Sequence, residues 1–420
     1  MKKAEIKKYI NTLGEQAKKA SNIIANISEN KKNIALEELK KNINISKNKL
    51  IKINKKDIEN ASNAKLSPTI IDRLTLNSNR IDNIIASLEE IIKIKDPIGN
   101  IISEWVRPNG LHIQKLSIPL GVIGIIYESR PNVTIDASAI SLKSGNAVIL
   151  RGGRDSFFSS QALKEIINKS FLSAGIPQNA VQMISTTDRF AVDEMLQLDK
   201  YIDVIIPRGG KELIKKIKEK STIPIVKHLD GVCHVYVEKN ADLKKAKDII
   251  FNSKMRRPGV CGASETLLID KPLMNKTLEL IKKLIDSKCE IRGDKFISKL
   301  HPDFKIAKEE DWKTEYLDKI ISIKVVNGTQ EAINHINKYS SGHTESIITE
   351  DKKVFESFFK QIDSAIILQN ASTQFADGGE FGFGSEIGIS TDKLHVRGPV
   401  GVEHLTSFKY VIHGNGQVRS

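Results

Sequence analysis

From residue 121 onward, the chain repeats one pattern: a short apolar run, a turn, and then a stretch with helical spacing. Runs at 121–127, 147–150 and 204–206 have the length and composition of buried strands. A second set of such runs lies at 234–237, 266–269, 320–326 and 364–368. Repeated strand–turn–helix units build parallel sheets with helices on their faces. The sequence therefore predicts an α/β protein.

The first hundred residues differ, because their apolar side chains recur at helical spacing. Residues 6, 10, 13 and 17 define one predicted helix. A later helix is expected to begin at Ser67 and Pro68, since serine caps a helix and proline fits its first position. We expect it to continue to Asp96 and Pro97, where proline ends it.

A chain of 420 residues exceeds one ordinary core and is expected to form two or three domains. We place a boundary near Asp230, between the two sets of apolar runs. Residues 371–420 are rich in glycine and end in a strand-like run at 407–412, which is typical of a segment that packs on another subunit.

The formal net charge of +14 raises the question of nucleic-acid binding. However, the lysines are dispersed over predicted helical surfaces, and aromatic residues suited to base stacking make up only 5% of the chain. Solvated surface charge is the explanation that we favour. The sequence has no apolar run of about 20 residues, no signal-peptide pattern and no H-E-x-x-H motif. It predicts a cytoplasmic protein without a membrane span, a nucleic-acid partner or a metal site.

Three widely spaced cysteines without a C-x-x-C pair argue against a disulfide framework. Cys261 lies in a glycine-flanked turn next to Arg256 and Arg257, where positive charge favours a thiolate nucleophile. The alternative is a small buried hydrophobic residue. We expect that buried role for Cys233, and a surface position at a helix end for Cys289.

Two similar turns, each with the order Arg-Gly-Gly-basic, follow apolar strands. They comprise Arg151, Gly152, Gly153 and Arg154, and then Arg208, Gly209, Gly210 and Lys211. Glycine permits close approach of a ligand to the backbone, a helix start attracts anions, and arginine suits phosphate. The turns therefore suit a dinucleotide, and their extra positive charge favours the 2′-phosphate of NADP. The alternative is a pair of ordinary strand-to-helix turns with solvated arginines.

Asn132 follows Arg130 and Pro131 just after the first predicted strand. Its side-chain amide can donate a hydrogen bond to a developing oxyanion. The alternative is an asparagine that satisfies its own turn.

Together these segments resemble the γ-glutamyl phosphate reductases, a family of the aldehyde dehydrogenase superfamily, along nearly the whole chain. The matching segments before the cysteine turn are 72–76, 80–81, 119–124, 127–132, 142–147, 151–153, 208–210 and 228–231. The later ones are 257–261, 265–268, 370–373, 375–378, 383–384, 386–391 and 393–399. Gly262 departs from the family pattern, which leads us to expect a polar residue such as asparagine after the nucleophile.

The resemblance implies an aldehyde dehydrogenase-like fold with two Rossmann-like parallel-sheet domains and a small oligomerisation segment. In this scheme residues 1–229 form the NADP-binding domain, from which about 101–118 can join the oligomerisation part. Residues 230–365 form the catalytic domain with Cys261. Residues 366–420 are a C-terminal segment that serves oligomerisation and returns to the core.

The resemblance also implies roles for single residues. Cys261 is the nucleophile, and Asn132 is an oxyanion donor, with the backbone N–H of Cys261 as the second donor. Glu315 resembles the acidic residue that holds the nicotinamide ribose. Arg151 falls where a lysine usually meets the adenosine ribose.

The implied activity is NADPH-dependent reduction of L-glutamyl 5-phosphate to L-glutamate 5-semialdehyde and phosphate through a cysteine thioester, the second step of proline biosynthesis. Besides this substrate and NADPH/NADP⁺, the expected partners are further copies of the chain, together with functional coupling to a separate glutamate 5-kinase. Two alternatives stay open: a sister enzyme acting on another acyl phosphate or an acyl-CoA, and a basic binding protein with a retired active site.

One difference from the wider superfamily concerns water. Aldehyde dehydrogenases that hydrolyse their thioester carry a glutamate base in a Glu-Leu-Gly-Gly segment, where this chain has His228-Leu-Asp-Gly231. The absence of that base suits an acyl group that exchanges with phosphate. A purely structural role for His228 stays open.

Overall fold

The computed structural model describes residues 2–227 and 230–419, except for the side chain of Thr69. These residues form two compact units. Unit 1 contains the described residues up to Lys227, residues 382–388, and those from Val400 onward. Unit 2 contains the described residues from 230 to 381 together with residues 389–399. The glycine-rich C-terminal segment is thus divided between the two units, and the roles assigned above to 1–229, 230–365 and 366–420 stay predictions.

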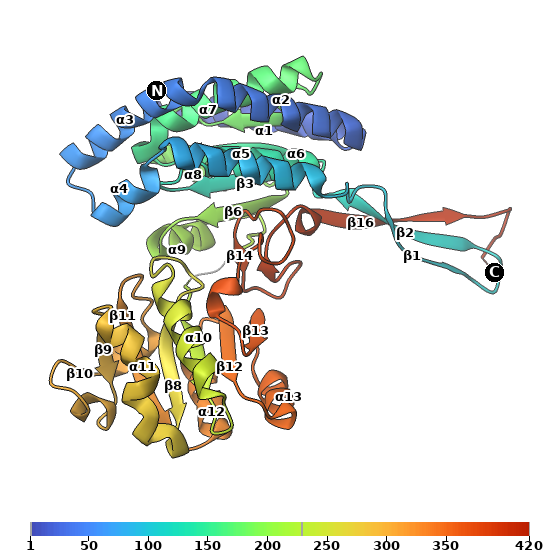
Figure 1. Ribbon diagram of the computed structural model, residues 1–420. Helices are drawn as coiled ribbons and strands as arrows, with labels where there is room; N and C mark the ends of the chain where they lie inside the picture. Colours follow the sequence, from blue (N-terminus) through green and yellow to red (C-terminus); the bar gives the residue numbers. More distant parts are fainter. Residues whose placement is uncertain (1, 228–229, 420) are drawn as a thin grey trace. The chain divides into compact units, whose positions relative to one another are not determined.

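Five helices open unit 1, and the longer ones each bury an apolar stripe. In α1, for example, Ile6, Ile10 and Ile24 are at most 1% exposed. The five are α1 (Lys3–Ile24), α2 (Glu29–Ile45), α3 (Lys47–Asn63), α4 (Pro68–Leu74) and α5 (Ser78–Lys93). Helix α2 packs against α5, and both α2 and α3 pack against α7 (Phe157–Ser173) (Figure 1).

The helix predicted from Ser67 begins as expected but is split in two. The Ser67 side chain accepts a hydrogen bond from the Ile70 N–H and starts α4. The chain then turns, and the Asn77 side chain accepts from the Arg80 N–H to start α5. A second capping residue within the apolar pattern therefore marked a helix boundary that periodicity alone did not show.

The main sheet of unit 1 consists of four parallel strands in the order β5-β4-β3-β6. The strands are β3 (Val122–Tyr127), β4 (Ala147–Gly152), β5 (Val181–Met183) and β6 (Val204–Arg208). The other helices of this layer are α6 (Val133–Lys143), α8 (Arg189–Met195) and α9 (Lys211–Lys220). Tyr127, at the carboxyl end of β3, lies beside both Gly152 and Arg208. Open parallel sheets bind ligands at this edge, where the strand order reverses.

A second, antiparallel sheet in unit 1 forms an arm that extends from the helical part (Figure 1). Its strands are β1 (Ile101–Val106), β2 (His112–Pro119) and β16 (Thr406–His413), in the order β1-β2-β16. All six residues of β1 are exposed. The first and last thirds of the chain therefore meet in the arm.

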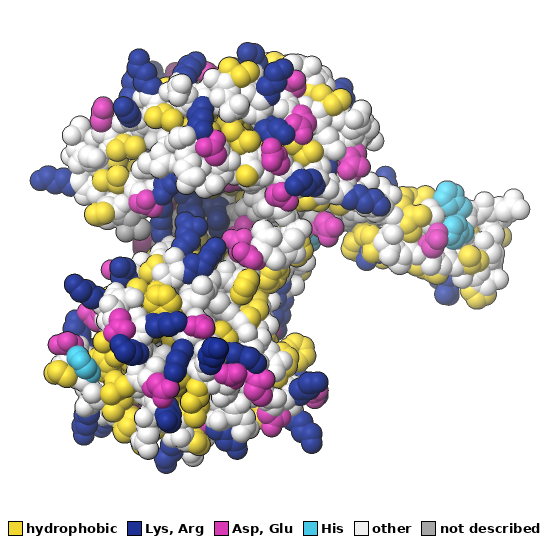
Figure 2. All heavy atoms as spheres, in the orientation of Figure 1, with side chains coloured by type: hydrophobic (Ala, Val, Ile, Leu, Met, Phe, Trp, Pro, Cys, Tyr) yellow, Lys and Arg dark blue, Asp and Glu magenta, His cyan; other side chains and the backbone are white. Residues whose placement is uncertain are grey.

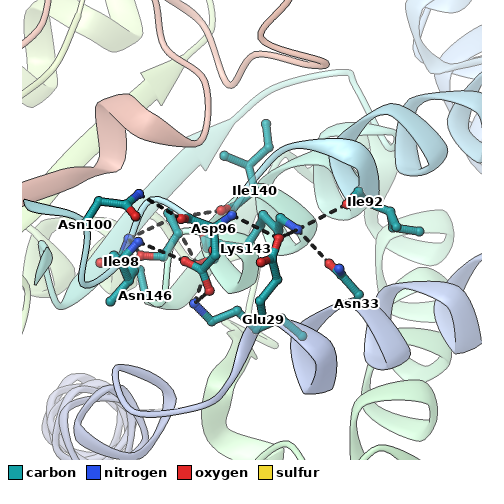
Figure 3. A network of polar contacts seen from close by, with 12 residues as sticks. Glu29, Asn33, Ile92, Asp96, Ile98, Asn100, Ile140, Lys143 and Asn146 are labelled. Atoms are coloured by element: carbon teal, nitrogen blue, oxygen red, sulfur yellow. Dashed lines mark hydrogen bonds and ion pairs between the residues drawn. The ribbon is translucent and has the colours of Figure 1, made fainter. Parts of the chain in front are cut away.

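A network of polar contacts around two buried lysines lies where the arm joins the helices (Figure 3). The side chains of Lys32 in α2 and Lys143 in α6 have no exposed surface. The Lys32 Nζ lies 2.6 Å from a carboxylate oxygen of Asp96, and the Lys143 Nζ donates to Asn33 Oδ1 at 2.6 Å and to the Ile92 carbonyl at 3.1 Å. Burial lowers the pKa of Lys143. Because Asp96 leads into β1, this network fixes the base of the arm on α2 and α6.

Unit 2 is built on a seven-stranded parallel sheet in the order β10-β9-β11-β8-β7-β12-β13. Its strands are β7 (Cys233–Val237), β8 (Ser264–Asp270), β9 (Glu290–Gly293), β10 (Lys305–Ile306), β11 (Ile320–Val326), β12 (Thr344–Ile348) and β13 (Ile366–Gln369). Its helices are α10 (Leu243–Met255), α11 (Thr277–Asp286), α12 (Thr329–Tyr339) and α13 (Lys352–Gln361). A short antiparallel pair, β14 (Ile389–Ser390) and β15 (Gly398–Pro399), completes the unit.

The predicted α/β class is confirmed, and every apolar run predicted as a strand overlaps an observed one. Two of the three cysteine expectations can be compared directly with the structure. Cys233 is fully buried, as predicted. The surface position predicted for Cys289 is wrong, because this side chain is only 6% exposed and burial raises its pKa to about 12. All three cysteines are free thiols.

The surface carries its positive charge in a dispersed form. On the face drawn in Figure 2, lysine and arginine side chains are interspersed with acidic ones over both units. Within residues 2–227 and 230–419, no helix is long and apolar enough to cross a membrane.

Candidate active site

Cys261 lies in unit 2, in the loop between α10 and β8, and its side chain is half-buried. The backbone of Gly231 packs directly on the backbone of this residue. A Cβ atom added to Gly231 would lie 2.0 Å from the Cys261 carbonyl oxygen and 2.6 Å from its Cα. Only glycine fits at this contact, which holds Cys261 against the segment that leads into β7.

Two further side chains hold the same contact. The Gly231 N–H donates to Glu315 Oε1 at 2.9 Å. The Cys233 thiol donates to the Cys261 carbonyl oxygen at 3.1 Å. Burial raises the pKa of Cys233 well above its ordinary value, so this sulfur stays a protonated donor. The structure thus brings the predicted residues Cys261 and Glu315 together around one glycine.

A buried ion pair lies beside the cysteine loop. Lys254, at the end of α10, and Glu265, in β8, have no exposed side-chain surface, and their charged atoms are 2.5 Å apart. Burial raises the pKa of Glu265 to about 8, although Lys254 opposes the shift. Since the loop with Cys261 connects these two elements, the pair holds both ends of the loop in place.

The segment at 372–376 also packs against the loop. The Gln374 side chain donates to the carbonyl oxygens of Ser253, at 3.1 Å, and Arg257, at 3.3 Å. A Cβ atom at Gly262 would lie 3.1 Å from the Thr373 carbonyl oxygen, which is a tight contact. The departure from the family pattern at Gly262 therefore has a local reason, since this segment leaves little room for a side chain.

Asn132 lies in unit 1, at the residue before α6, with helical backbone angles of −57° and −32°. Its side chain does not cap the helix. The amide nitrogen Nδ2 instead donates to Asp136 Oδ2 at 3.0 Å, one helical turn along α6. The turn-satisfying role considered for Asn132 is therefore not the one that the structure shows.

The first Arg-Gly-Gly turn follows β4. The Arg151 guanidinium donates to the carbonyl oxygens of Gly152, at 2.9 Å, and Thr187, at 3.4 Å. Its Nε atom is buried without a hydrogen-bond partner among the described residues, and burial lowers the pKa of the guanidinium. Gly152 packs against the Tyr127 ring and Gly153 against the Asp155 side chain. The glycines are thus explained by close packing within the chain, while Arg151 keeps an unused donor.

The second turn, at Arg208, Gly209 and Gly210, follows β6. The Gly210 N–H, at the start of α9, donates to the Glu128 carboxylate at 3.2 Å, and a Cβ atom at Gly209 would lie 2.5 Å from the same carboxylate. The Glu128 carboxylate therefore accepts from the Gly210 N–H, which the sequence predicts as a donor to an anionic ligand. The Nε atom of Arg208 is buried without a partner in the described part of the chain.

Sequence reasoning missed several residues of these arrangements. Glu128 lies between the two turns, and Asp136 holds the amide of Asn132. The spacing of four residues between Asn132 and Asp136 at a helix start was a usable signal. The contact of Gly231 with Cys261 joins segments that are distant in the sequence, so no local sequence pattern indicates it. His228 lies outside the described residues.

Comparison with known proteins identifies the family to which the chain belongs. Residues 3–294 match the aldehyde dehydrogenase family. The γ-glutamyl phosphate reductase of Bartonella quintana (strain Toulouse) is 53% identical over 409 residues, which cover 97% of this chain and 99% of that protein. That of Paramagnetospirillum magneticum is 51% identical over 420 residues, covering 100% of this chain and 99% of the relative.

A solved structure gives the same result for the fold. The γ-glutamyl phosphate reductase of Thermotoga maritima is 42% identical and superposes with a TM-score of 0.94, covering 98% of this chain and 100% of that one. The predicted aldehyde dehydrogenase-like fold is confirmed. The chain belongs to the aldehyde dehydrogenase family and, within it, to the γ-glutamyl phosphate reductases, which are oxidoreductases.

Proposed function

We propose that the chain reduces L-glutamyl 5-phosphate to L-glutamate 5-semialdehyde and phosphate with NADPH, through a thioester on Cys261. Family membership along the whole chain supports the substrate. The observation that carries the covalent mechanism is the fixed position of Cys261, whose backbone is held by Gly231 and by the Cys233 thiol. A nucleophile must be held to within about 1 Å to react efficiently.

In the first step, the Cys261 thiolate attacks the acyl carbonyl carbon of the substrate. A carbon–sulfur bond forms, the bond from carbon to the phosphate oxygen breaks, and phosphate leaves. The negative charge that develops on the carbonyl oxygen is stabilised by the amide of Asn132 and the backbone N–H of Cys261. This nucleophilic step divides a difficult reduction into two easier ones.

The second step returns Cys261 to its thiolate and releases the aldehyde, and the same two donors stabilise the oxyanion that forms. NADPH, when bound, supplies the hydride for this step. The residues suited to hold it are Arg151 and Arg208, whose buried Nε atoms keep unused donors, and Arg154 beside the first turn. Glu315 is the acceptor proposed for the nicotinamide ribose.

The segment at 228–231 offers no glutamate at the position of a water-activating base. We therefore propose that the thioester exchanges with phosphate and resists hydrolysis. The product aldehyde can close on its own amine to 1-pyrroline-5-carboxylate without the enzyme. Proline biosynthesis, a cytoplasmic location and coupling to a separate glutamate 5-kinase belong to the same proposal.

We also propose that the arm joins copies of the chain, because one of its faces carries several large aromatic and apolar side chains that remain exposed. Strand pairing places Trp105 opposite Ile113, and Ile113 opposite Ile412, so these side chains share one face. On that face Trp105 and Tyr410 contact each other edge to face, with ring centres 6.1 Å apart. The larger side chains there remain exposed: Trp105 38%, Phe408 45%, Tyr410 55% and Ile412 55%. An exposed apolar face of this kind fits a protein partner, here a second copy.

The direct test of the activity is the reverse reaction: phosphate-dependent reduction of NADP⁺ with L-glutamate 5-semialdehyde. We expect NADPH formation that requires phosphate and the Cys261 thiol. Reduction that proceeds equally without phosphate would contradict the acyl phosphate chemistry. In the forward direction, a clear preference for NADH over NADPH would contradict the interpretation of the arginine turns.

The test of the arm is the mass in solution. Ile412→Glu places a charge on the apolar face and is expected to shift the oligomer toward smaller species in light scattering. Lys409→Glu, on the opposite face of the same strand, is the matched control and is expected to keep the wild-type mass. Equal masses for wild type and Ile412→Glu would contradict the assignment of this face.

A further inference from the structure

We propose that Asp136 is a positioning residue that holds the amide of Asn132 in the orientation needed for oxyanion donation. This inference rests on the proposed function, because it assumes that Asn132 donates to the reacting carbonyl oxygen. The observation behind it is the 3.0 Å hydrogen bond from Asn132 Nδ2 to Asp136 Oδ2.

The geometry shows that Asn132 is not used to begin its helix. An asparagine at this position commonly accepts a backbone N–H through its side-chain oxygen. Here the side chain makes no such bond, and its nitrogen points along α6 to Asp136. The amide is therefore oriented by a specific side-chain acceptor.

The chemistry of the pair explains why that acceptor is a carboxylate. A carboxamide can exchange the positions of its oxygen and nitrogen by a half-turn, and a neighbour that both donates and accepts tolerates either orientation. An ionised carboxylate only accepts, so it selects the orientation with the nitrogen facing it. One hydrogen of the Asn132 NH₂ group then binds Asp136, and the second remains for an oxyanion.

The surroundings of Asp136 keep it ionised although it is half-buried. Burial raises its pKa to about 6, while the hydrogen bond from Asn132, the charge of Arg208 at the end of β6, and the Ser87 side chain of α5 oppose the shift. A carboxylate placed in this way costs folding stability at neutral pH, since its charged form is favoured less in the folded state. Such a cost is expected where a residue serves the reaction.

A structural role for Asp136 would be electrostatic, because an acidic residue in the first turn stabilises a helix. The two roles predict different results for Asp136→Asn, which keeps the size of the side chain. If Asp136 orients Asn132, kcat of the phosphate-dependent reverse reaction falls about three- to tenfold, the effect of one hydrogen bond, with KM for the aldehyde unchanged. The melting temperature stays equal or rises, because a partly buried charge is removed. A lower melting temperature with wild-type kcat would show the structural role and overturn the inference.

The double variant Asn132→Ala/Asp136→Asn shows whether Asp136 acts through Asn132. If it does, the double variant is no slower than Asn132→Ala alone. Rate losses that multiply would mean that Asp136 acts by another route, and would overturn the inference. Asp82→Asn in α5, whose exposed carboxylate pairs with Lys47, is the matched control and is expected to keep wild-type kcat.

Failure of the inference and failure of the proposed function are distinguishable. If Asn132→Ala reacts at the wild-type rate, the oxyanion role of Asn132 is wrong and the inference falls with it. If Asn132→Ala is slow but Asp136→Asn is normal, the role of Asn132 stands and only the inference is overturned.

Discussion

Gly231→Ala should slow the reaction by displacing Cys261, although the thiol itself is unchanged. In the structure, the added methyl carbon would lie 2.0 Å from the carbonyl oxygen of Cys261, 2.6 Å from its Cα and 2.7 Å from its carbonyl carbon. Such contacts are essentially never shorter than 3.0 Å, so the backbone of Cys261 must move by about 1 Å. All three clashing atoms are backbone, so no rotation of a side chain can relieve the contact.

A displacement of about 1 Å at a reacting group typically costs about 10²-fold in rate. Overpacking of this kind also destabilises by about 1–3 kcal/mol. We therefore expect kcat of Gly231→Ala to fall about 100-fold in the phosphate-dependent reverse assay, with a modest loss in melting temperature. The protein should remain folded. The rate at which iodoacetamide alkylates Cys261 should differ from the wild-type rate, because the thiol moves with its backbone.

Gly259→Ala is the control in the same loop. Its added carbon would have a single neighbour, the Leu317 carbonyl oxygen at 3.8 Å, which is an ordinary contact. This variant should keep wild-type kcat within about twofold. If Gly231→Ala retained full activity while folded, the reasoning from the position of Cys261 would be refuted.

Three further predictions concern single side chains. Asn132→Ala should lower kcat by about 10²–10³, and a normal rate would remove its oxyanion role. Lys254→Met leaves Glu265 buried without its cation, so we expect the free energy of unfolding to fall by about 3–5 kcal/mol, and to fall further as pH rises. The double variant Lys254→Met/Glu265→Gln should recover most of this stability in thermal unfolding. His335 is 4% exposed, both of its ring nitrogens lack a partner among the described residues, and burial lowers its pKa to about 2. The unfolded chain therefore binds a proton on His335 at a higher pH than the folded chain does, and the free energy of unfolding of the wild type falls by up to about 1.4 kcal/mol per pH unit below about pH 6.5. His335→Leu should lose less stability on acidification. Equal acid sensitivity of the two proteins would contradict this prediction.

The sequence was sufficient for the parts of the fold that follow local rules. Buried parallel strands are apolar runs, so the runs at 121–127 and 320–326 were readable as β3 and β11. Strand β12 was not, because it begins Thr344-Glu345-Ser346 and yet is fully buried. Glu345 is accommodated by His234, 2.9 Å away in the neighbouring strand, a pairing across 111 residues that no local pattern records.

The same distinction between local signals and distant contacts applies to the candidate site. Cys261 and Asn132 were identifiable because each lies in a short matching segment. The groups that hold them come from elsewhere in the chain or from the next helical turn: Gly231 for Cys261, and Asp136 for Asn132. The Arg-Gly-Gly turns suggested phosphate contacts, but the packing of Glu128 against Gly209 depends on the order of strands in the sheet and could not be predicted.

The most direct test of the central claim is a single-turnover measurement without phosphate. The protein is mixed with L-glutamate 5-semialdehyde and NADP⁺, and NADPH absorbance and the intact mass of the protein are recorded. We predict a burst of one NADPH per subunit, a glutamyl adduct on Cys261, and renewed turnover when phosphate is added. No adduct on Cys261, or continuous turnover without phosphate, would contradict the covalent mechanism.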